Sequence, residues 1–149
     1  MTDAKKPAPT VFVTDFMVTV IFKITPEMHL WEVAELMMKH AISGAPVVDK
    51  MDRVISILGE GDTLRLAAQH GVESQVVKCL DQLPGPNQLI TLQKSNTFTD
   101  CYRIFMKHKI HRIPIVDSNG LLKGLVTRST ILRMMVEAHH GRKIPTKVA

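Results

Sequence analysis

Apolar residues recur along two stretches of the chain with the spacing of one helical face. Residues 27–40 and 96–108 both carry apolar side chains at positions i, i+3, i+4, i+7 and i+8, the pattern of an amphipathic helix. Thr25 and Pro26 precede the first stretch and suit the N-cap and the first helical position. The expected apolar faces are Leu30, Val33, Ala34, Met37 and Met38 in the first helix and Phe98, Cys101, Tyr102, Phe105 and Met106 in the second.

Two short apolar runs follow each predicted helix, with turn-forming residues between them. Each pair of runs predicts a β-hairpin, and Asn119-Gly120 is a strong turn signal in the second pair. A further helix closes each unit and is followed by a glycine. These elements are expected at 46–48, 54–58 and 62–70 in the first half and at 114–116, 121–126 and 129–140 in the second. Between the halves, residues 72–82 predict a linker helix that the Pro/Gly-rich stretch 83–87 ends.

The two halves of the chain carry the same sequence pattern. HAISGAPVVD at 40–49 returns 68 positions later as HKIHRIPIVD at 108–117, and SILGEGDTLR at 56–65 returns at the same offset as GLVTRSTILR. Self-similarity at a fixed offset indicates a duplicated structural unit. Each half therefore predicts a strand-helix-strand-strand-helix unit. Two such units bury a shared face, and the cleft between them is where a ligand would bind.

The repeated pattern H-x-I-x-x-x-P-V-V-D, hairpin, G-h-h-T-x-S-D-h-L-R resembles the cystathionine-β-synthase (CBS) domain. Two copies over roughly residues 11–140 resemble a stand-alone CBS pair. The resemblance implies an α/β (α+β) fold of two β-α-β-β-α repeats, packed sheet to sheet about a pseudo-twofold axis. The expected organisation is a disordered arm at 1–10, repeat 1 at 11–71, a linker helix with a Pro/Gly boundary at 72–87, repeat 2 at 88–140 and a mobile basic tail at 141–149.

Members of this family commonly bind adenine nucleotides or adenosyl compounds between the repeats, relay their level to a partner and form homodimers. The resemblance therefore implies a non-catalytic regulatory module whose ligand is AMP, ADP, ATP or S-adenosylmethionine and which requires no cofactor. Two alternatives stay open. One is a degenerate pair that acts as a scaffold for an unknown protein target, and the other is a nucleic-acid-binding protein.

In the family, the stretch after the last strand supplies hydroxyl groups to phosphate and an aspartate to ribose. A helix start offers free N–H groups to an anion, and a carboxylate binds sugar hydroxyls well. The second half has Thr127 and Ser129 but Thr130 in place of the aspartate. The first half has Asp62 but glycines in place of the hydroxyl residues. Because Glu60 would repel phosphate, we expect the first site to tolerate adenosine or a cationic adenosyl compound and the second to accept phosphate.

His111-Arg112 resembles a pair that nucleotide-binding members direct at phosphate, whose geometry a guanidinium matches. The alternative is that Arg112 is a surface arginine near the sheet edge. Thr25 would contact adenine in the family's geometry, with helix capping as the alternative. The candidate ligand-binding residues are Asp62, Thr127, Ser129, Thr130, Arg112, His111, Thr25 and Pro114.

Charge is distributed unevenly along the chain. The formal net charge is +5, yet repeat 1 holds five Lys/Arg against eight Asp/Glu and repeat 2 holds eight against three. A basic lobe attracts anions such as phosphate, and the opposed charges suggest a head-to-tail homodimer. The basic excess lies largely in the tail and one lobe, and only 5% of residues are aromatic. Nucleic-acid binding is therefore the least favoured function.

Other function classes lack their sequence signals. Cys79 and Cys101 form no CxxC motif, which favours free thiols in a reducing compartment. The sequence has neither a signal peptide nor an apolar stretch that would span a bilayer, so we expect a cytoplasmic protein with no membrane partner. Two histidine pairs, 108/111 and 139/140, lack companion ligands, so no metal site is expected. No P-loop, GxSxG or HExxH motif is present, which argues against an enzyme and leaves no catalytic residue.

The nine methionines are expected mostly in the core.

Overall fold

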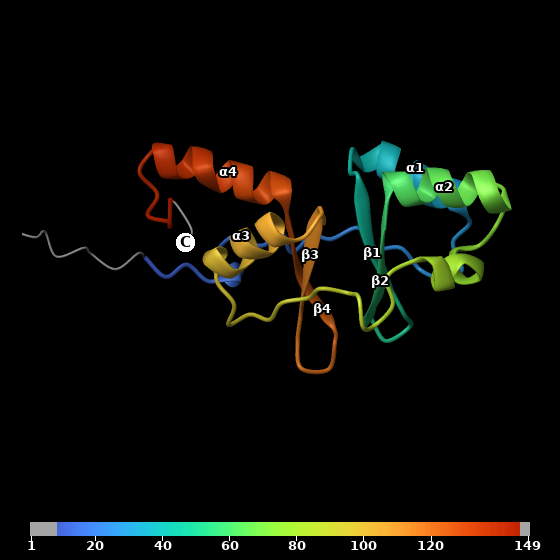
Figure 1. Cartoon of the computed structure of the whole chain (residues 1–149), viewed down its shortest axis with the longest axis horizontal. Helices are drawn as coiled ribbons and strands as arrows, with labels where there is room; N and C mark the ends of the chain where they lie inside the picture. Colours follow the sequence, from blue (N-terminus) through green and yellow to red (C-terminus); the bar gives the residue numbers. More distant parts are fainter. Residues whose placement is uncertain (1–8, 147–149) are drawn as a thin grey trace, which may run out of the picture.

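Two β-hairpins lie at the centre of the molecule, and the helices lie outside them (Figure 1). The computed structural model describes residues 9–146. In chain order its elements are η1 (Val13–Asp15), α1 (Leu30–His40), β1 (Gly44–Val48), β2 (Val54–Gly59), α2 (Glu60–His70), η2 (Val76–Gln82), α3 (Phe98–Lys107), β3 (Arg112–Val116), β4 (Leu122–Thr127) and α4 (Arg128–His139). The helix-hairpin-helix unit thus occurs twice, as the repeated sequence predicts.

The two hairpins have equivalent registers. Gly44 pairs with Gly59 at the open end of β1–β2, and Arg112 pairs with Thr127 at the open end of β3–β4. Both hairpins are antiparallel, and in both the register shifts one residue before the turn. The 68-residue offset in the sequence is therefore also a structural equivalence.

The strand expected at the start of each repeat is reduced to a single parallel bridge, so each sheet has two strands instead of three. Ile24 exchanges two backbone hydrogen bonds of 2.9 Å with β1, and Leu92 pairs in the same way with β3. A local turn follows each bridge, in which the amides of Thr25 and Gln93 each donate to a side chain three residues ahead. Local bonds of this kind compete with a sheet ladder.

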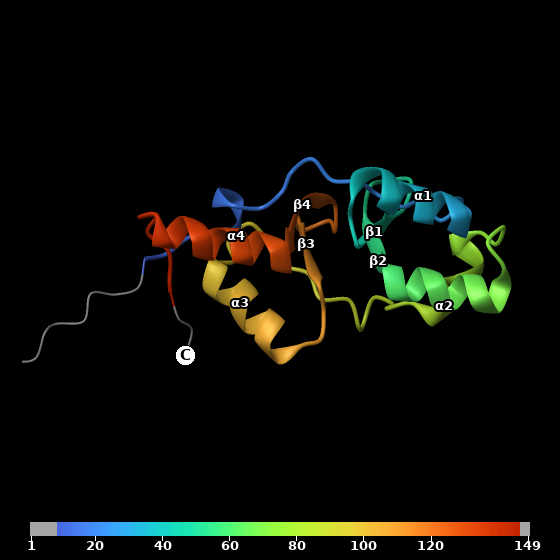
Figure 2. The ribbon, with the colours of Figure 1, turned by 90° about the horizontal axis from the view of Figure 1, so that it is seen from above.

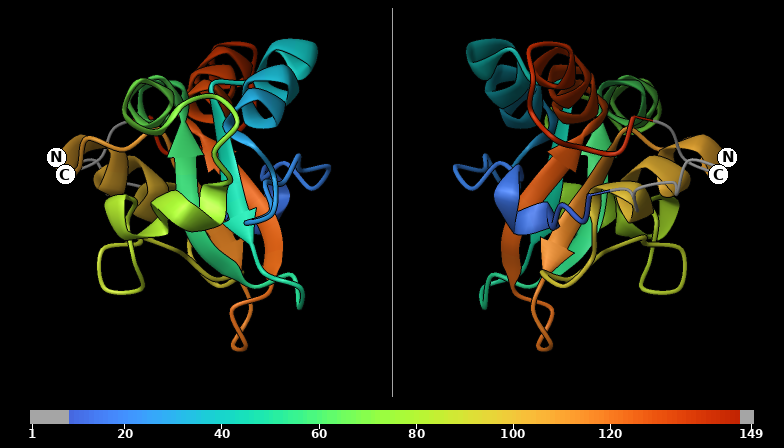
Figure 3. Two further views of the ribbon diagram at one scale, coloured as in Figure 1. Left: turned by 90° about the vertical axis from the view of Figure 1, so that its right-hand side faces the viewer. Right: turned by 90° about the vertical axis from the view of Figure 1, so that its left-hand side faces the viewer.

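Both faces of the sheets are covered. Every residue of β1 and β3 is buried. Val47 packs in a core with α1 and α2, and Ile115 packs in a second core with α3 and α4. Because side chains alternate along a strand, Pro46 and Pro114 face the opposite hairpin. Backbone hydrogen bonds of 3.0 and 3.1 Å also join the turn ends of the two hairpins. The α+β fold with sheets packed face to face is confirmed, and Figure 3 shows the two hairpins stacked.

Both ends of the described chain pack against repeat 2. Val13 and Phe16 lie in the core formed with α3 and α4, and Val18 exchanges two 2.9 Å backbone hydrogen bonds with Leu125. Figure 2 shows this segment passing alongside α4 before it reaches α1. Ile144 is buried in the same core and Pro145 is also buried, so this part of the expected mobile tail is packed, whereas residues 141–143 and 146 are exposed. Residues 1–8 of the expected arm and 147–149 of the tail lie outside the described residues.

The first helix begins three residues later than its apolar pattern suggests. Its N-cap is His29, whose amide donates to Glu32 Oε1 at 3.0 Å. The expected cap, Thr25, lies five residues before the helix, so the capping alternative for that residue is wrong. A carboxylate three residues beyond the cap satisfies a free amide, and Glu32 supplies it only if the helix starts at Leu30.

The prediction that the methionines lie mostly in the core is wrong for one side of each helix pair. Met38 is 83% exposed and Met106 is 72% exposed, although both fall on the predicted apolar faces. Met135 on α4 is also exposed, whereas Met37 is buried. The apolar stripes are wider than the surface that the sheets cover, so each helix pair leaves apolar residues in solvent.

The linker helix predicted over 72–82 is the short 3₁₀ helix η2. Both cysteines are free and buried, as expected for thiols without a partner. Burial, followed by the neighbouring Asp100, raises the pKa of Cys101 to about 12, so this thiol stays protonated. Within residues 9–146, helices stay too short and too polar to cross a bilayer.

Candidate functional site

Arg112 of repeat 2 inserts its side chain into repeat 1. It begins β3, it is only 7% exposed, and its Nη2 donates to Ser43 Oγ at 2.8 Å. A Cβ atom at Gly44 would overlap the guanidinium, and one at Gly59 would lie 3.3 Å from Nη1. Two glycines therefore form the notch that holds this arginine. The alternative of a surface arginine at a sheet edge is wrong.

Two carboxylates of repeat 1 face this guanidinium. Asp62 Oδ2 lies 3.7 Å from the point at which a Gly59 Cβ would stand, on the same side as the arginine. Burial lowers the pKa of Arg112, whereas Asp62 and then Glu60 raise it and Arg128 lowers it. Among described residues, no ion pair within 4 Å joins Arg112 to either carboxylate, so the charges interact through space at the junction.

The helices α2 and α4 begin at this junction in equivalent ways. The first amide of α2, at Glu60, donates to Ser43 O at 2.9 Å, and the first amide of α4, at Arg128, donates to His111 O at 3.1 Å. Both helix starts thus lie against the loop that leads into the neighbouring strand. Equivalent positions carry opposite charges, because Glu60 in repeat 1 corresponds to Arg128 in repeat 2.

Asp62 and Thr130 occupy the same position, the third residue of each helix. Asp62 Oδ2 accepts from Gly59 N at 3.0 Å, and its other oxygen accepts from Arg65 at 3.2 Å. Thr130 Oγ1 accepts from Thr127 N at 3.1 Å, and Thr127 Oγ1 accepts from Thr130 N at 3.1 Å. All three candidate residues therefore cap their own helices, and a ligand would have to share these groups.

The other candidates lie elsewhere around the junction. Ser129 is exposed and lines a cavity of about 530 Å³ between α3 and α4. Pro114 is buried on the inner face of its sheet. Thr25 follows Ile24, which runs parallel to β1, so the chain at Thr25 leads away from the Gly44 end of that strand. The structure brings together Asp62, His111 and Arg112. Ser129 follows Arg128, whose amide bonds His111 O, and lines the cavity on the α3 side.

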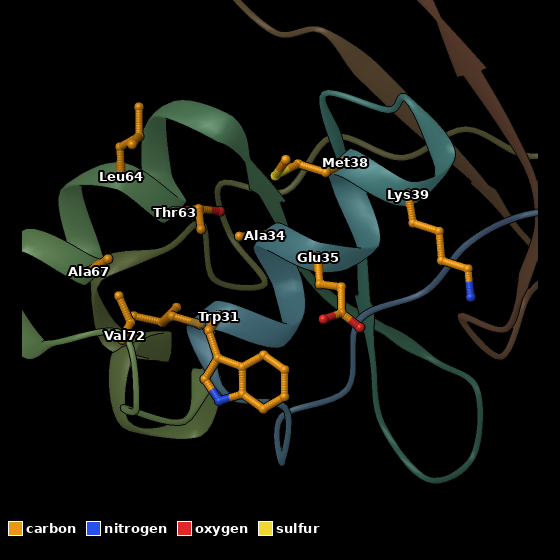
Figure 4. A pocket seen from close by; sticks show the side chains of 10 residues that line it. Trp31, Ala34, Glu35, Met38, Lys39, Thr63, Leu64, Ala67 and Val72 are labelled. Carbon is orange, nitrogen blue, oxygen red and sulfur yellow. The ribbon is translucent and has the colours of Figure 1, made fainter.

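Cavities adjoin the junction and the helix pairs. A cavity of about 360 Å³ is lined by Ser43 and Glu60 together with the end of α1. A groove of about 540 Å³ lies between α1 and α2, and Figure 4 shows Trp31, Met38 and Leu64 around it. The first cavity adjoins the acceptor of the Arg112 hydrogen bond, whereas the groove lies on the outer side of the helices.

Sequence reasoning missed the roles of Ser43, Gly44 and Gly59. The family pattern presents these positions only as losses of phosphate-binding residues. The repeat offset contains the signal that would have found the notch: Gly44 is equivalent to Arg112 itself, and Gly59 is equivalent to its strand partner, Thr127. A large side chain in one repeat is matched by missing side chains in the other.

His111 reports on the charge of this junction. Desolvation, followed by the charges of Arg128 and Arg112, lowers its pKa below 6.5, while Asp62 opposes the shift. We expect an NMR titration of the ring protons to give a pKa below 6.5, and Arg128→Gln to raise it. Because the pKa of His111 is lower in the folded chain than in the unfolded chain, the unfolded chain binds a proton at this ring more readily. Stability should therefore fall as the pH drops below about 6.5. A pKa at or above the ordinary histidine value would contradict this charge arrangement.

Within residues 9–146, no cluster of three His, Cys, Asp or Glu side chains has the geometry to hold a metal ion. The two rings of His139 and His140 lie 5.2 Å apart, edge to face. The groups at the junction are instead suited to hydrogen bonding with sugar hydroxyls and an anion.

Comparison with known proteins agrees with the repeated fold. The family model described as the CBS domain matches residues 13–69 and 86–137. An inosine-5′-monophosphate dehydrogenase of Halalkalibacterium halodurans is 31% identical over 119 residues, which cover 80% of this chain and 23% of the dehydrogenase. The chain therefore spans about a quarter of the length of the curated relatives it matches.

Solved structures share the fold at low sequence identity. CBSX2 from Arabidopsis thaliana is 19% identical with a TM-score of 0.73, covering 90% of this chain and all of that one. The CBS domain pair of protein MJ0100, in complex with 5′-methylthioadenosine and S-adenosyl-L-methionine, is 21% identical with a TM-score of 0.75, covering 87% of this chain and 99% of that one. CBSX2 has also been solved in complex with AMP.

Proposed function

The chain belongs to the CBS domain family, and from that premise we propose that it is a non-catalytic regulatory module that binds an adenine nucleotide or an adenosyl compound between its two repeats. The observation that carries the proposal is the junction at which Arg112, Asp62 and the starts of α2 and α4 meet. The ligands in the structures of similar proteins, AMP, 5′-methylthioadenosine and S-adenosylmethionine, support the adenosine moiety.

The residues at the junction suit the parts of such a ligand. Asp62 offers a carboxylate for ribose hydroxyls. Thr127 and the first amides of α4 offer donors for phosphate, next to the cation of Arg128. The cavity beside Ser43 and Glu60 lies at the start of α2. Binding across two repeats would bias their relative packing and so pass a signal to a partner protein, provided that the ligand favours one arrangement.

Calorimetric titration with AMP, ADP, ATP, 5′-methylthioadenosine and S-adenosylmethionine tests this function. We expect saturable binding of at least one of them and a rise in the melting temperature, because a ligand that binds only the folded state stabilises it. The absence of heat and of a thermal shift with all five would contradict the proposal and favour the scaffold alternative. A salt-sensitive gel shift would instead favour nucleic-acid binding.

Thr130→Asp is expected to tighten AMP binding roughly tenfold, because a charge-assisted bond to ribose is worth about 1.5–3 kcal/mol before the hydroxyl's own contribution is lost. The fold should accept a carboxylate at position 130, because Asp62 occupies the equivalent position in repeat 1 and caps α2 by accepting a 3.0 Å hydrogen bond. Calorimetry measures the change. Thr99→Asp, which makes the same charge change near the start of α3, serves as the control. Unchanged or weaker AMP binding in Thr130→Asp would contradict a ribose role for this position.

The exposed helix faces suggest a second copy of the chain as a partner. The α1/α2 groove and the α3/α4 cavity have matching apolar positions, Met38 with Met106 and Leu64 with Leu132. The two surfaces carry opposite charges at one equivalent pair, because Glu60 lines a cavity beside the α1/α2 groove and Arg128 lines the α3/α4 cavity. The α1/α2 groove itself is lined by one carboxylate, Glu35, and one ammonium group, Lys39.

We propose a head-to-tail homodimer in which the α1/α2 pair of each copy packs on the α3/α4 pair of the other. Figure 3 shows α1, α2 and α4 along one edge of the molecule, which suits simultaneous contact of both grooves. Sedimentation or light scattering should give twice the 16.7 kDa of the chain. The free buried thiols agree with a cytoplasmic location, which we include in the proposal.

A further inference from the structure

The outer groove between α3 and α4 follows one face of α4 over the length of that helix. A cavity of about 530 Å³ near the start of α4 and one of about 280 Å³ near its end share Tyr102 and Met135, so they form a continuous groove. Its lining residues on α4 recur at spacings of three and four, which places them on one side of the helix. They are Arg128, Ser129, Ile131, Leu132, Met135, Ala138 and His139.

The two ends of this groove differ in polarity. Arg128 and Ser129 line the end at the start of α4, whereas Ile144 and Pro145, both buried, close the other end beside the ring of His139. α4 rises about 16 Å between Arg128 and His139, close to the length of an extended chain of about 13 carbon atoms. A molecule with a polar head and a single apolar chain would therefore place its head at Arg128 and the end of its chain at Ile144.

Arg128 gives the head-group end a positive charge that no ion pair neutralises. Its side chain is exposed, and the ion pairs within 4 Å that the described residues form all engage other basic residues. Among the described residues, no carboxylate lines either cavity of the groove. An apolar channel with an unpaired cation at one end is complementary to an amphiphile whose head group is an anion.

The equivalent surface of repeat 1 lacks this complementarity. The residues 68 positions before those of the larger cavity line a cavity of only about 210 Å³ between α1 and α2. Glu60 stands there in place of Arg128, and Thr63 stands in place of Ile131. Glu35 lines the adjoining α1/α2 groove. A carboxylate near the head group would repel an anion, so the α1/α2 surface serves as an internal control for the α3/α4 groove.

We propose that the α3/α4 groove binds a free long-chain fatty acid, with its carboxylate at Arg128 and its acyl chain along α4 toward Ile144. A guanidinium presents parallel N–H donors that match a carboxylate, and Ser129 offers a hydroxyl beside it. The proposal does not require an adenosine ligand between the repeats, because the groove lies between two outer helices (Figure 1). The acyl chain would cover apolar side chains that are exposed in the free groove, Met106, Leu132 and Met135.

The same groove forms half of the surface proposed for the homodimer. A fatty acid and the α1/α2 pair of a second copy cannot occupy it together. Fatty-acid binding should therefore shift the chain from dimer to monomer, and sedimentation should show this shift as the ligand concentration rises. The fatty acid would thus regulate the assembly of the chain.

Calorimetry with tetradecanoate, below the concentration at which it forms micelles, tests the proposal. We expect saturable binding at one site per chain. Octanoate should bind roughly tenfold more weakly or worse, because its shorter chain buries less apolar surface. Tetradecyltrimethylammonium, which has the same chain and a cationic head, should not saturate the site. Arg128→Gln should weaken tetradecanoate binding roughly tenfold, because it removes the charge-assisted contact to the carboxylate.

Leu132→Asp and Leu64→Asp are a matched pair of variants. The two leucines are equivalent in the repeats and are 61% and 74% exposed, so folding should tolerate both changes, and circular dichroism verifies this. Leu132→Asp should abolish tetradecanoate binding, because it places a carboxylate in the acyl channel. Leu64→Asp should leave binding at least as tight as in the unmodified protein. Both variants alter the proposed dimer surface, so a difference between them does not come from dimerisation.

The outcomes are distinct from those for adenosine binding and for the dimer. Equal weakening in Leu132→Asp and Leu64→Asp, or equal affinity for the anionic and cationic amphiphiles, would overturn the fatty-acid site. Binding only to micelles or phospholipid vesicles would mean that the groove contacts a lipid surface, and it would also overturn the proposal. If tetradecanoate does not bind the unmodified protein, the inference fails, while the adenosine and dimer proposals stand on their own titrations.

Discussion

A chain carrying Leu64→Arg is expected to run as a monomer at concentrations at which the unmodified protein is dimeric. Leu64 is 74% exposed in the groove between α1 and α2, and the proposed partner surface around Leu132 is basic at Arg128. A new cation would replace an apolar contact and meet like charge, and twofold symmetry repeats the change at the second contact. We expect the dissociation constant to rise by at least 100-fold, measured by sedimentation equilibrium.

The complementary variant determines how the two copies are oriented. Leu132→Asp should also give a monomer, because its carboxylate would replace an apolar contact and approach Glu35 in the α1/α2 groove and Glu60 beside it. Mixing the two variants should restore a dimer in a head-to-tail arrangement, since the guanidinium introduced by Leu64→Arg in one chain would then face the carboxylate introduced by Leu132→Asp in the other.

Met51→Arg is the control for the dimer experiment, because Met51 is exposed at the hairpin turn away from both grooves. This variant should stay dimeric. A dimer that survives Leu64→Arg would contradict the proposed surface. Monomers in the mixture would contradict the orientation.

Phe98→Ala is expected to lower the free energy of unfolding by about 3–5 kcal/mol, the usual cost of deleting a buried phenylalanine. Phe98 is fully buried at the start of α3, and its ring lies edge-on to Phe16 with centroids 5.6 Å apart. Urea denaturation at a fixed protein concentration measures the loss.

Phe12→Ala is the matched control for this substitution. Phe12 is the same residue type in a neighbouring segment and is 44% exposed. Its replacement should cost less than about 1 kcal/mol, because a side chain that stays largely in solvent loses little buried contact when it is truncated. Equal losses in the two variants would mean that Phe98 does not anchor the second core.

The repeated pattern was sufficient to predict the two hairpins and four helices, because each element has a local signal. It was insufficient for features that depend on contacts between distant segments. Nothing in the residues around Val13 and Phe16 indicates that they pack with α3 and α4 instead of with the nearby α1. The exposure of Met38 could not be predicted for a similar reason. Periodicity identifies the apolar face of a helix, but it does not show how much of that face the sheet covers.

In the candidate site, too, some residues could be predicted from the sequence and one contact could not. Asp62, Thr127 and Thr130 were identified from the resemblance to the CBS domain, and the structure places them at equivalent helix starts. The insertion of Arg112 between Gly44 and Gly59 was not predicted, because its hydrogen bond to Ser43 joins positions 69 residues apart and the notch depends on side chains that are absent. Glycines are informative in such a case only when each is compared with its counterpart in the other repeat.

The packing of residues 11–18 against repeat 2 has a consequence for biosynthesis. The core around Val47 is assembled from residues 24–83 and is complete soon after they leave the ribosome, whereas Val13 and Phe16 must wait for their partners up to Ile144. Residues 11–18 are thus made before the first core but are buried only after it has formed. During translation they expose apolar side chains, which a chaperone would recognise, until the residues up to Ile144 have been made.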